Sequence, residues 1–188
     1  MTMQGEVMEQ SGEASVAPGA SAAHLVSLSH HPYLIRPVMR ADEAAVQDMF
    51  SRSSTYDLRL RCLGAMKDFP RQAAARLTRS DPAHETALAA VEAEGPAPGE
   101  IVGLVHLIDE PDRPGVAEFD IMVRSDLHGR GIGFQLMKEI LTSARERGLG
   151  EIVGYVSGEN GAMLWMASEL GFSLDRIEAG VVRVVARL

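Results

Sequence analysis

Hydrophobic residues recur with two different periods along the chain, and each period predicts a different kind of element. Between residues 42 and 79 they return every three to four positions, which is the spacing of one face of a helix. Val46, Met49 and Phe50 make such a face after Asp42, and Pro70 opens a second helix. The same stretch of chain predicts a short strand over 33–37 and a helix over 55–63.

From residue 85 onward the period becomes two, which is the spacing of one face of a strand. Three strands are predicted, joined by turns rich in glycine and proline, over residues 85–93, 100–109 and 116–123. In the third strand, Glu118, Asp120 and Met122 share one face, and the alternate positions between them are apolar. An acidic pair on this strand is a candidate for chemistry.

The C-terminal half alternates helices and strands. A glycine-rich turn at 128–133 leads into a helix with apolar residues at helical spacing, which ends at Gly148. After it come a strand over 151–156, a helix over 160–170 and strand segments at 172–174 and 181–185. This order predicts a mixed α/β fold, in which helices flank a central, mainly antiparallel sheet.

The first 31 residues differ from the rest in composition and pattern, because they are rich in Ser, Ala, Gly and Glu and show no periodicity. We expect a disordered or loosely packed extension over 1–31 and one folded domain over 32–188. The first 32 residues contain no lysine or arginine, so they lack the basic start of an export signal. No apolar run approaches the ~20 residues that would span a bilayer, so we expect a cytoplasmic protein without membrane partners.

Charge and cysteine content exclude some classes of partner and of binding site. With 18 basic and 26 acidic residues the formal net charge is −8. This balance argues against a nucleic-acid partner, because phosphate contacts need a basic surface, and it suits amines or lysine-rich proteins. The single cysteine, Cys62, excludes an intrachain disulfide and any site with several cysteine ligands.

Closely spaced glycines at a helix start can form an anion site, because backbone N–H groups there point at a bound phosphate. The turn at 128–133 lacks the Walker spacing, and it comes too late in the chain for a dinucleotide fold. Taken alone, these glycines favour a tight turn that binds no ligand.

The turn resembles the acetyl-CoA pyrophosphate loop of the GNAT acetyltransferase superfamily, whose pattern is Gln/Arg-x-x-Gly-x-Gly/Ala. His128, Gly131 and Gly133 occupy those positions, and only the histidine departs from the pattern. The asparagine that the superfamily places at the next helix start is matched by Asn160, and the Gly-Phe that follows is matched by residues 171–172. The resemblance runs from about Tyr33 to the C-terminus and implies an N-acetyltransferase that uses acetyl-CoA and no metal.

Several segments also resemble bacterial Pat-type protein lysine acetyltransferases, at residues 35–37, 75–78, 117–119 and 125–131. This narrower resemblance implies a lysine side chain of a protein as the acceptor, for example on an acyl-CoA synthetase. It also places the catalytic glutamate at Glu118, which would take a proton from the amine; Asp120 is the rival. There are two alternatives: an acetyltransferase that acts on a small amine, and a non-catalytic module that binds acyl-CoA.

The resemblance further assigns residues along the cofactor. Met122 and Val123 are expected to pair with the pantetheine amides, and Asn160 to contact the pantetheine arm. The pyrophosphate is expected on the backbone of the turn, formed by His128, Gly129, Arg130, Gly131, Ile132, Gly133 and Phe134. Arg124 and Arg130 are candidates for the 3′-phosphate, or else solvated surface residues.

Other side chains near the expected site have simpler interpretations. The tyrosine that many GNAT enzymes use as a general acid is replaced by Ala167, and Tyr155 is a possible substitute or a packing residue. His106 is interpreted as structural, and Asp109 and Glu110 as solvated. The acceptor groove is expected from residues 55–79.

Overall fold

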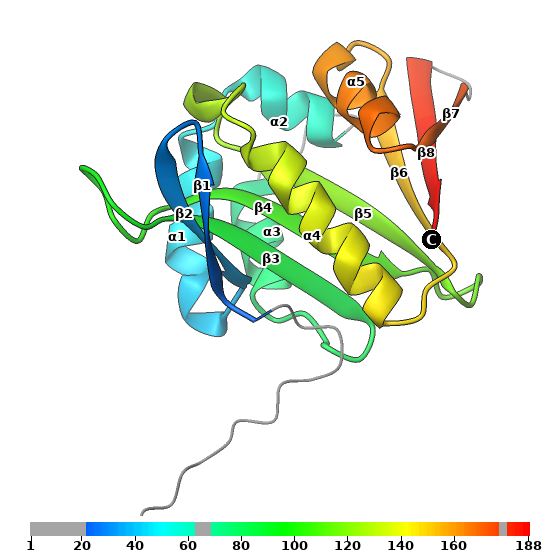
Figure 1. The fold of residues 1–188 in the computed structure, drawn as a ribbon, viewed down its shortest axis with the longest axis horizontal. Helices are drawn as coiled ribbons and strands as arrows, with labels where there is room; N and C mark the ends of the chain where they lie inside the picture. The colour runs from blue at the N-terminus through cyan, green and yellow to red at the C-terminus, as the bar shows by residue number, and fades with distance from the viewer. Residues whose placement is uncertain (1–21, 63–68, 177–179) are drawn as a thin grey trace, which may run out of the picture.

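The computed structural model of the protein describes residues 22–62, 69–176 and 180–188. Its centre is an eight-stranded sheet with the strand order β1-β2-β3-β4-β5-β6-β8-β7 (Figure 1). Neighbouring strands are antiparallel except β5 and β6, which are parallel. The predicted mixed α/β fold with a mainly antiparallel sheet is therefore confirmed.

Apart from β1, the strands and α-helices follow the predicted order and begin and end close to the predicted positions. The strands are β1 (His24–Leu28), β2 (His31–Pro37), β3 (Glu85–Glu92), β4 (Ile101–Asp109), β5 (Val116–Val123), β6 (Glu151–Ser157), β7 (Ser173–Arg176) and β8 (Val181–Arg187). The helices are α1 (Glu43–Ser51), α2 (Thr55–Cys62), α3 (Phe69–Leu77), α4 (Ile132–Glu146) and α5 (Gly161–Glu169), with short 3-10 turns η1 (Arg40–Asp42) and η2 (Ser125–Leu127). Within the described ranges, no helix has both the length and the apolar character that crossing a membrane would require.

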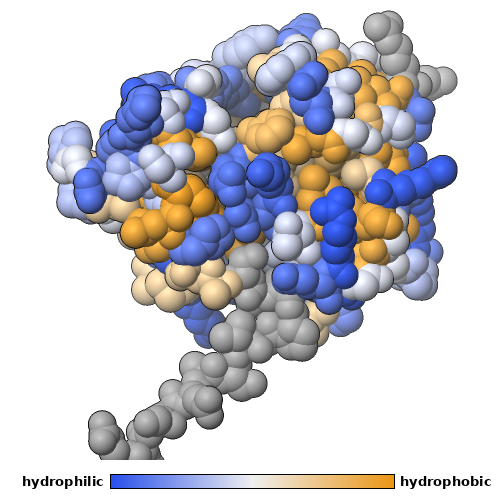
Figure 2. Space-filling view, in the orientation of Figure 1, coloured by the Kyte–Doolittle hydropathy of each residue, from blue (hydrophilic) through white to orange (hydrophobic). Residues whose placement is uncertain are grey.

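Helices cover the two faces of the sheet and bury a separate core on each. Helices α4 and α5 lie on one face, whereas α1 and α3 lie on the other (Figure 1). Exposed residues of α4 recur every three to four positions, at Lys138, Thr142 and Arg145. Figure 2 shows hydrophilic residues along the outward side of this helix, with hydrophobic areas on either side. The amphipathic pattern of α4 therefore sets which side of the helix packs on the sheet.

The sheet begins earlier than the sequence predicts. Strand β1 pairs with β2 from His24 to Leu28, so residues 24–31 are part of the sheet and not of a loose extension. Val26 and Leu28 pack against the core beneath α4. Residues 1–21 of the expected extension, and residues 63–68 of the expected acceptor region, lie outside the described residues. The folded unit thus includes β1, which the domain boundary at 31/32 would separate from its partner β2.

Candidate active site

A wedge between the two parallel strands is the main opening in the sheet. Strands β5 and β6 pair only from Val116 to Glu118, opposite Glu151 to Val153. Beyond Glu118, β5 keeps β4 as its partner up to Val123, and β6 keeps β8 up to Ser157. The β6-facing edge of residues 119–123 therefore has no ladder partner among the described strands. Such an edge can accept an extended ligand as an additional strand.

On the α4 side, the ring of Phe119 fills the space between β5 and β6. This ring stacks edge-on against Phe172, with 5.5 Å between the ring centres. It also lies directly over Gly154 of β6, where a Cβ atom would stand only 2.6 Å from the ring carbons. Gly154 is thus required by the close approach of an aromatic ring and not by its own backbone angles.

We expect Gly154→Ala to lower the melting temperature, because the added methyl group would force the Phe119 ring to move. Overpacking a core in this way typically costs ~1–3 kcal/mol. Thermal denaturation followed by circular dichroism measures the change. Gly161→Ala is the matched control, because nothing lies within 4 Å of the Cβ position there. Equal melting temperatures for the two variants would show that the ring does not fill the wedge.

The glycine-rich turn lies at the start of α4, beyond the C-terminal end of β5. Gly131 is the N-cap of α4 and has a φ of 86°, a left-handed conformation that disfavours residues with a side chain. No described side chain caps this end of the helix. The first N–H groups of α4 therefore have no intrahelical or side-chain acceptor, which is the condition for binding an anion.

Three other elements surround this turn. A Cβ atom at Gly133 would lie 3.5 Å from Val123 Cγ2 and 3.7 Å from Met166 Sδ, so the turn lies against β5 and α5. The hairpin of β1 and β2 reaches it from the other side, where the Ser29 hydroxyl donates to the Arg130 carbonyl oxygen at 3.4 Å. This contact could not be predicted from the sequence, because strand β1 was not among the predicted elements.

The structure gives two predicted cofactor residues local structural roles. The ring of His128 is exposed, and its Nε2 lies 3.0 Å from the Val123 carbonyl oxygen, which ties the turn to the end of β5. Asn160 is the N-cap of α5, and its Oδ1 accepts a hydrogen bond from the Met163 amide at 3.1 Å. Both contacts fix the ends of elements beside the wedge.

The remaining predicted cofactor residues differ in exposure. Met122 points into the core beneath α1 and α3, and Val123 is partly buried on the opposite face. Only their backbone edges face the wedge, as pairing with an extended ligand requires. In the turn, Ile132 is buried, whereas Gly129, Arg130 and Phe134 are exposed.

Arg124 does not have either of the roles that the sequence suggested for it. Its side chain is only 7% exposed and forms ion pairs of 2.7 Å with both Glu100 and Asp126. Arg52 shares Glu100 at 2.8 Å. Because the Arg124 guanidinium is buried and already paired, it is neither a solvated surface group nor available for a 3′-phosphate.

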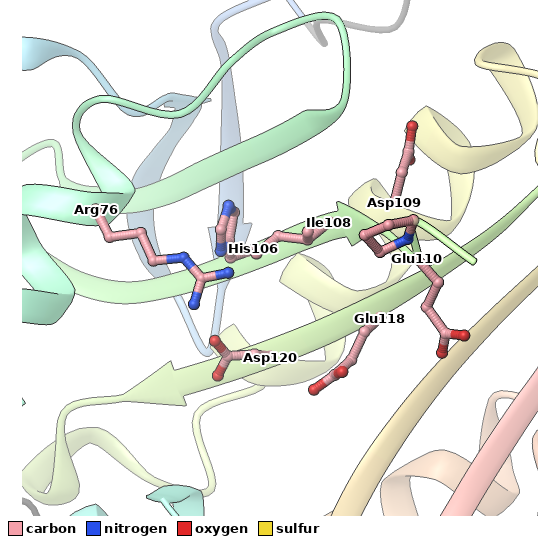
Figure 3. Close-up of a pocket in the computed structure, with 8 residues that line it drawn as sticks. Arg76, His106, Ile108, Asp109, Glu110, Glu118 and Asp120 are labelled. Carbon is pink, nitrogen blue, oxygen red and sulfur yellow. The ribbon is translucent and has the colours of Figure 1, made fainter. Parts of the chain in front are cut away.

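Glu118 lies where the wedge opens, as the last residue of β5 that pairs with β6. Its carboxylate faces a pocket of about 200 Å³ on the α3 side of the sheet, shown in Figure 3. The pocket is lined by Arg76, His106, Ile108, Asp109, Glu110, Pro111, Glu118 and Asp120. Burial raises the pKa of Glu118, and the negative charges of Asp120 and Glu110 raise it further against the opposing effect of Arg76. A carboxylate with a raised pKa at a cavity is suited to accept a proton.

Two acidic residues expected to be solvated line this pocket. The Asp109 carboxylate is turned away from Glu118 in Figure 3 and pairs with Arg147 at 2.5 Å. Glu110 pairs with Arg113 at 3.1 Å and adds negative charge beside Glu118. Both therefore belong to the walls of the site.

Two further residues line the pocket. Arg76 was not a candidate from the sequence, and His106 was interpreted as structural. The β4–β5 register places His106 opposite Asp120, and Arg76 reaches the same pocket from α3 (Figure 3). Neither residue is close to Glu118 in sequence, and only the strand register and the packing of α3 bring them together. Pairing the predicted strands at 100–109 and 116–123 in every possible register could have suggested His106 as a candidate.

The two positions considered for a general acid differ in burial. Ala167 is fully buried in the core beneath α5, so a small residue fits there. Tyr155 is 37% exposed and lies on the opposite face of β6 from the buried Ile152 and Val156.

Residues 52–172, well over half of the chain, match the acetyltransferase (GNAT) family. The chain belongs to this family. The match spans the helices α2 to α5, the strands β3 to β6, the glycine-rich turn and Glu118. The resemblance seen in the sequence is therefore confirmed for the superfamily.

Curated relatives include the L-methionine sulfoximine/L-methionine sulfone acetyltransferases of Pseudomonas paraeruginosa and Pseudomonas aeruginosa. Each is 32% identical to this GNAT protein over 84 residues, which is 42% of this chain and 48% of the relative. The chain thus spans about half the length of the curated relatives it matches.

Solved structures share the fold. The GNAT domain of S. lividans PAT superposes with a TM-score of 0.78 and 24% identity, over 88% of this chain and 97% of that domain. The structure of yncA from Salmonella typhimurium with its cofactor acetyl-CoA gives a TM-score of 0.65 and 18% identity, over 82% and 92%. At these identities the similarity establishes the GNAT fold of this chain.

Proposed function

We propose that this protein transfers the acetyl group of acetyl-CoA to a primary amine, with Glu118 as the general base. The observation that carries the proposal is the position of Glu118 at the mouth of the wedge between β5 and β6. The uncapped start of α4 lies at the far end of the same strand. Family membership supports the same chemistry. The proposed catalytic unit runs from β1 to β8.

The cofactor is proposed to lie along β5. The N–H groups at 129–134 would hold the pyrophosphate, and the pantetheine amides would pair with the free edge at Met122 and Val123. Asn160, at the start of α5, would contact the pantetheine arm. This orientation of the cofactor brings its thioester toward Glu118. Glu118 lies on β5, several residues before the turn.

The chemistry requires a neutral amine, because an ammonium group has no lone pair with which to attack. A free lysine has a pKa of about 10.4, so a base must remove a proton near neutral pH. Glu118 takes that proton, and the amine then attacks the thioester carbon. Backbone N–H groups on the β5 edge are the candidate donors to the carbonyl oxygen as it gains negative charge. The thiolate, whose conjugate thiol has a pKa of about 8.5, is a good leaving group.

We propose a lysine side chain of a protein as the acceptor. The Pat-type segments at 35–37, 75–78, 117–119 and 125–131 support this choice, and the acidic pocket suits an incoming ammonium group. An acyl-CoA synthetase is the protein class that the resemblance suggests. The curated relatives favour a second candidate, a small amine related to amino acids, because their names give such an acceptor.

The proposal is tested by measuring CoA release from acetyl-CoA with three sets of acceptors. Purified acyl-CoA synthetases, a protein extract and a panel of amino acids and polyamines would each be offered at matched amine concentration. Release with the proteins alone supports lysine acetylation, and release with an amino acid supports the second candidate. Binding of acetyl-CoA without release in any set would indicate a non-catalytic acyl-CoA-binding module.

A further inference from the structure

A histidine–carboxylate pair lies on the wall of the proposed acceptor pocket. His106 on β4 is 3% exposed, and its Nε2 lies 2.8 Å from the Glu85 carboxylate on β3. Because an ionised carboxylate only accepts hydrogen bonds, the proton of the neutral ring must be on Nε2. The other ring nitrogen, Nδ1, then carries a lone pair and can accept a proton.

The same ring lines the pocket that contains Glu118. His106 lies directly opposite Asp120 in the β4–β5 register, and Glu118 is two residues before Asp120 on the same face of β5. Arg76 reaches toward this group from α3 (Figure 3). Three elements packed around the ring thus bring charged groups to it: Glu85 from β3, Asp120 from β5 and Arg76 from α3.

These neighbours act on His106 in opposite directions. Burial lowers the pKa of His106, the hydrogen bond to Glu85 and the charges of Asp120 and Glu85 raise it, and Arg76 lowers it. The net effect is a lowered pKa of His106, so the ring is neutral near pH 7. It is therefore in the state that can take up a proton.

We propose that His106, held by Glu85, is a second proton acceptor of the active site. The proposal rests on the acetyl transfer proposed above, in which the acceptor nitrogen loses two protons. Glu118 removes one before attack. The C–N bond then forms, and Nδ1 of His106 accepts the second proton as the tetrahedral intermediate collapses and the C–S bond breaks. The ring becomes an imidazolium that is hydrogen-bonded to the Glu85 carboxylate, and CoA leaves as the thiolate.

Glu118 and His106 thus each accept one of the two protons that the acceptor nitrogen loses. Each group returns its proton to water or to the thiolate when the products leave, so the cycle releases one proton for each acetylated ammonium group. Glu85 is the positioning residue, because its carboxylate selects the Nε2–H tautomer and stabilises the imidazolium. The arrangement follows the general logic of a carboxylate that orients a histidine base.

His106→Gln and Glu85→Gln test the proposal, with His24→Gln as the matched control. Glutamine at 106 can keep a hydrogen bond to Glu85 but is not a base. His24 forms a similar pair with Glu139 at 3.1 Å, but on β1 and α4 and not in the pocket. Each variant is assayed for kcat and for KM of acetyl-CoA across pH, and its fold is checked by circular dichroism.

We expect His106→Gln to lower kcat by about 100-fold, the low end of general-base effects, with KM for acetyl-CoA little changed. Its profile of kcat against pH should lose one ionisation. Glu85→Gln removes a charge that raises the pKa of His106, so that ionisation should move to lower pH. His24→Gln should match the wild type in both respects.

Nitrogen-15 NMR of the wild-type imidazoles gives an independent readout that does not depend on turnover. It should show the Nε2–H tautomer for His106. A folded His106→Gln with wild-type kcat and pH profile would overturn the proposal, and so would an Nδ1–H tautomer. If wild type transferred no acetyl group to any acceptor, the proposed function would fail instead, and the NMR result would still decide the tautomer.

Discussion

Replacing Glu118 by glutamine should slow acetyl transfer by roughly 10²–10⁴-fold, the usual loss when a general base is removed. Glutamine keeps the shape and hydrogen bonding of the side chain but not its basicity. Acetyl-CoA affinity, measured by calorimetry, should barely change, because the turn at 129–133 is untouched. Glu94→Gln, on an exposed turn, is the control for losing one carboxylate.

The pH dependence of this variant follows from the same carboxylate. Glu118 must be ionised to accept a proton, so wild-type activity should rise as pH passes its pKa. Because burial and neighbouring carboxylates raise that pKa, the rise should lie at higher pH than for an ordinary glutamate. Glu118→Gln should lose this ionisation. If Asp120→Asn abolishes turnover while Glu118→Gln retains it, the base is Asp120.

Gly131→Val should abolish measurable acetyl-CoA binding at concentrations that saturate the wild type. A β-branched residue at a φ of 86° is strained, by roughly 1–2 kcal/mol for a left-handed residue, and its side chain would stand at the start of α4. The N–H groups that we assign to the pyrophosphate would then be displaced or covered. Calorimetric titration with acetyl-CoA measures the loss.

Gly148→Val is the matched control at the other end of α4. Its φ of 73° imposes a similar backbone cost, and nothing lies within 4 Å of its Cβ position. Both variants should be destabilised to a similar degree, but only Gly131→Val should lose the cofactor. Unchanged acetyl-CoA affinity in a folded Gly131→Val would show that the pyrophosphate binds elsewhere.

The elements of the fold could be predicted from sequence because their apolar periods are regular and their ends carry glycine or proline. Strand β1 could not. Its apolar residues Leu25, Val26 and Leu28 follow a polar, glycine-containing segment. Its hairpin also turns at Ser29 and His30, which adopt positive φ angles of 49° and 63°. Glycine and asparagine usually mark such positions, so no turn signal was present.

The candidate site could be predicted only where it is local in sequence. The glycine turn and Glu118 were found because each lies within one short motif. His106, Glu85 and Arg76 come from β4, β3 and α3, and strand register and helix packing decide that they meet. The pairing of Arg124 with Glu100 and Asp126 could not be predicted either, because a sequence does not show which charges share a buried position.

Mass spectrometry of an acyl-CoA synthetase incubated with isotope-labelled acetyl-CoA tests the central claim most directly. With wild-type protein, the labelled acetyl group should be found on the Nζ of a lysine, and with Glu118→Gln it should be nearly absent. Amino acids incubated in parallel with the labelled acetyl-CoA would show whether small amines are acetylated instead. Binding of acetyl-CoA with no labelled acetyl group on any protein or small amine would contradict the account.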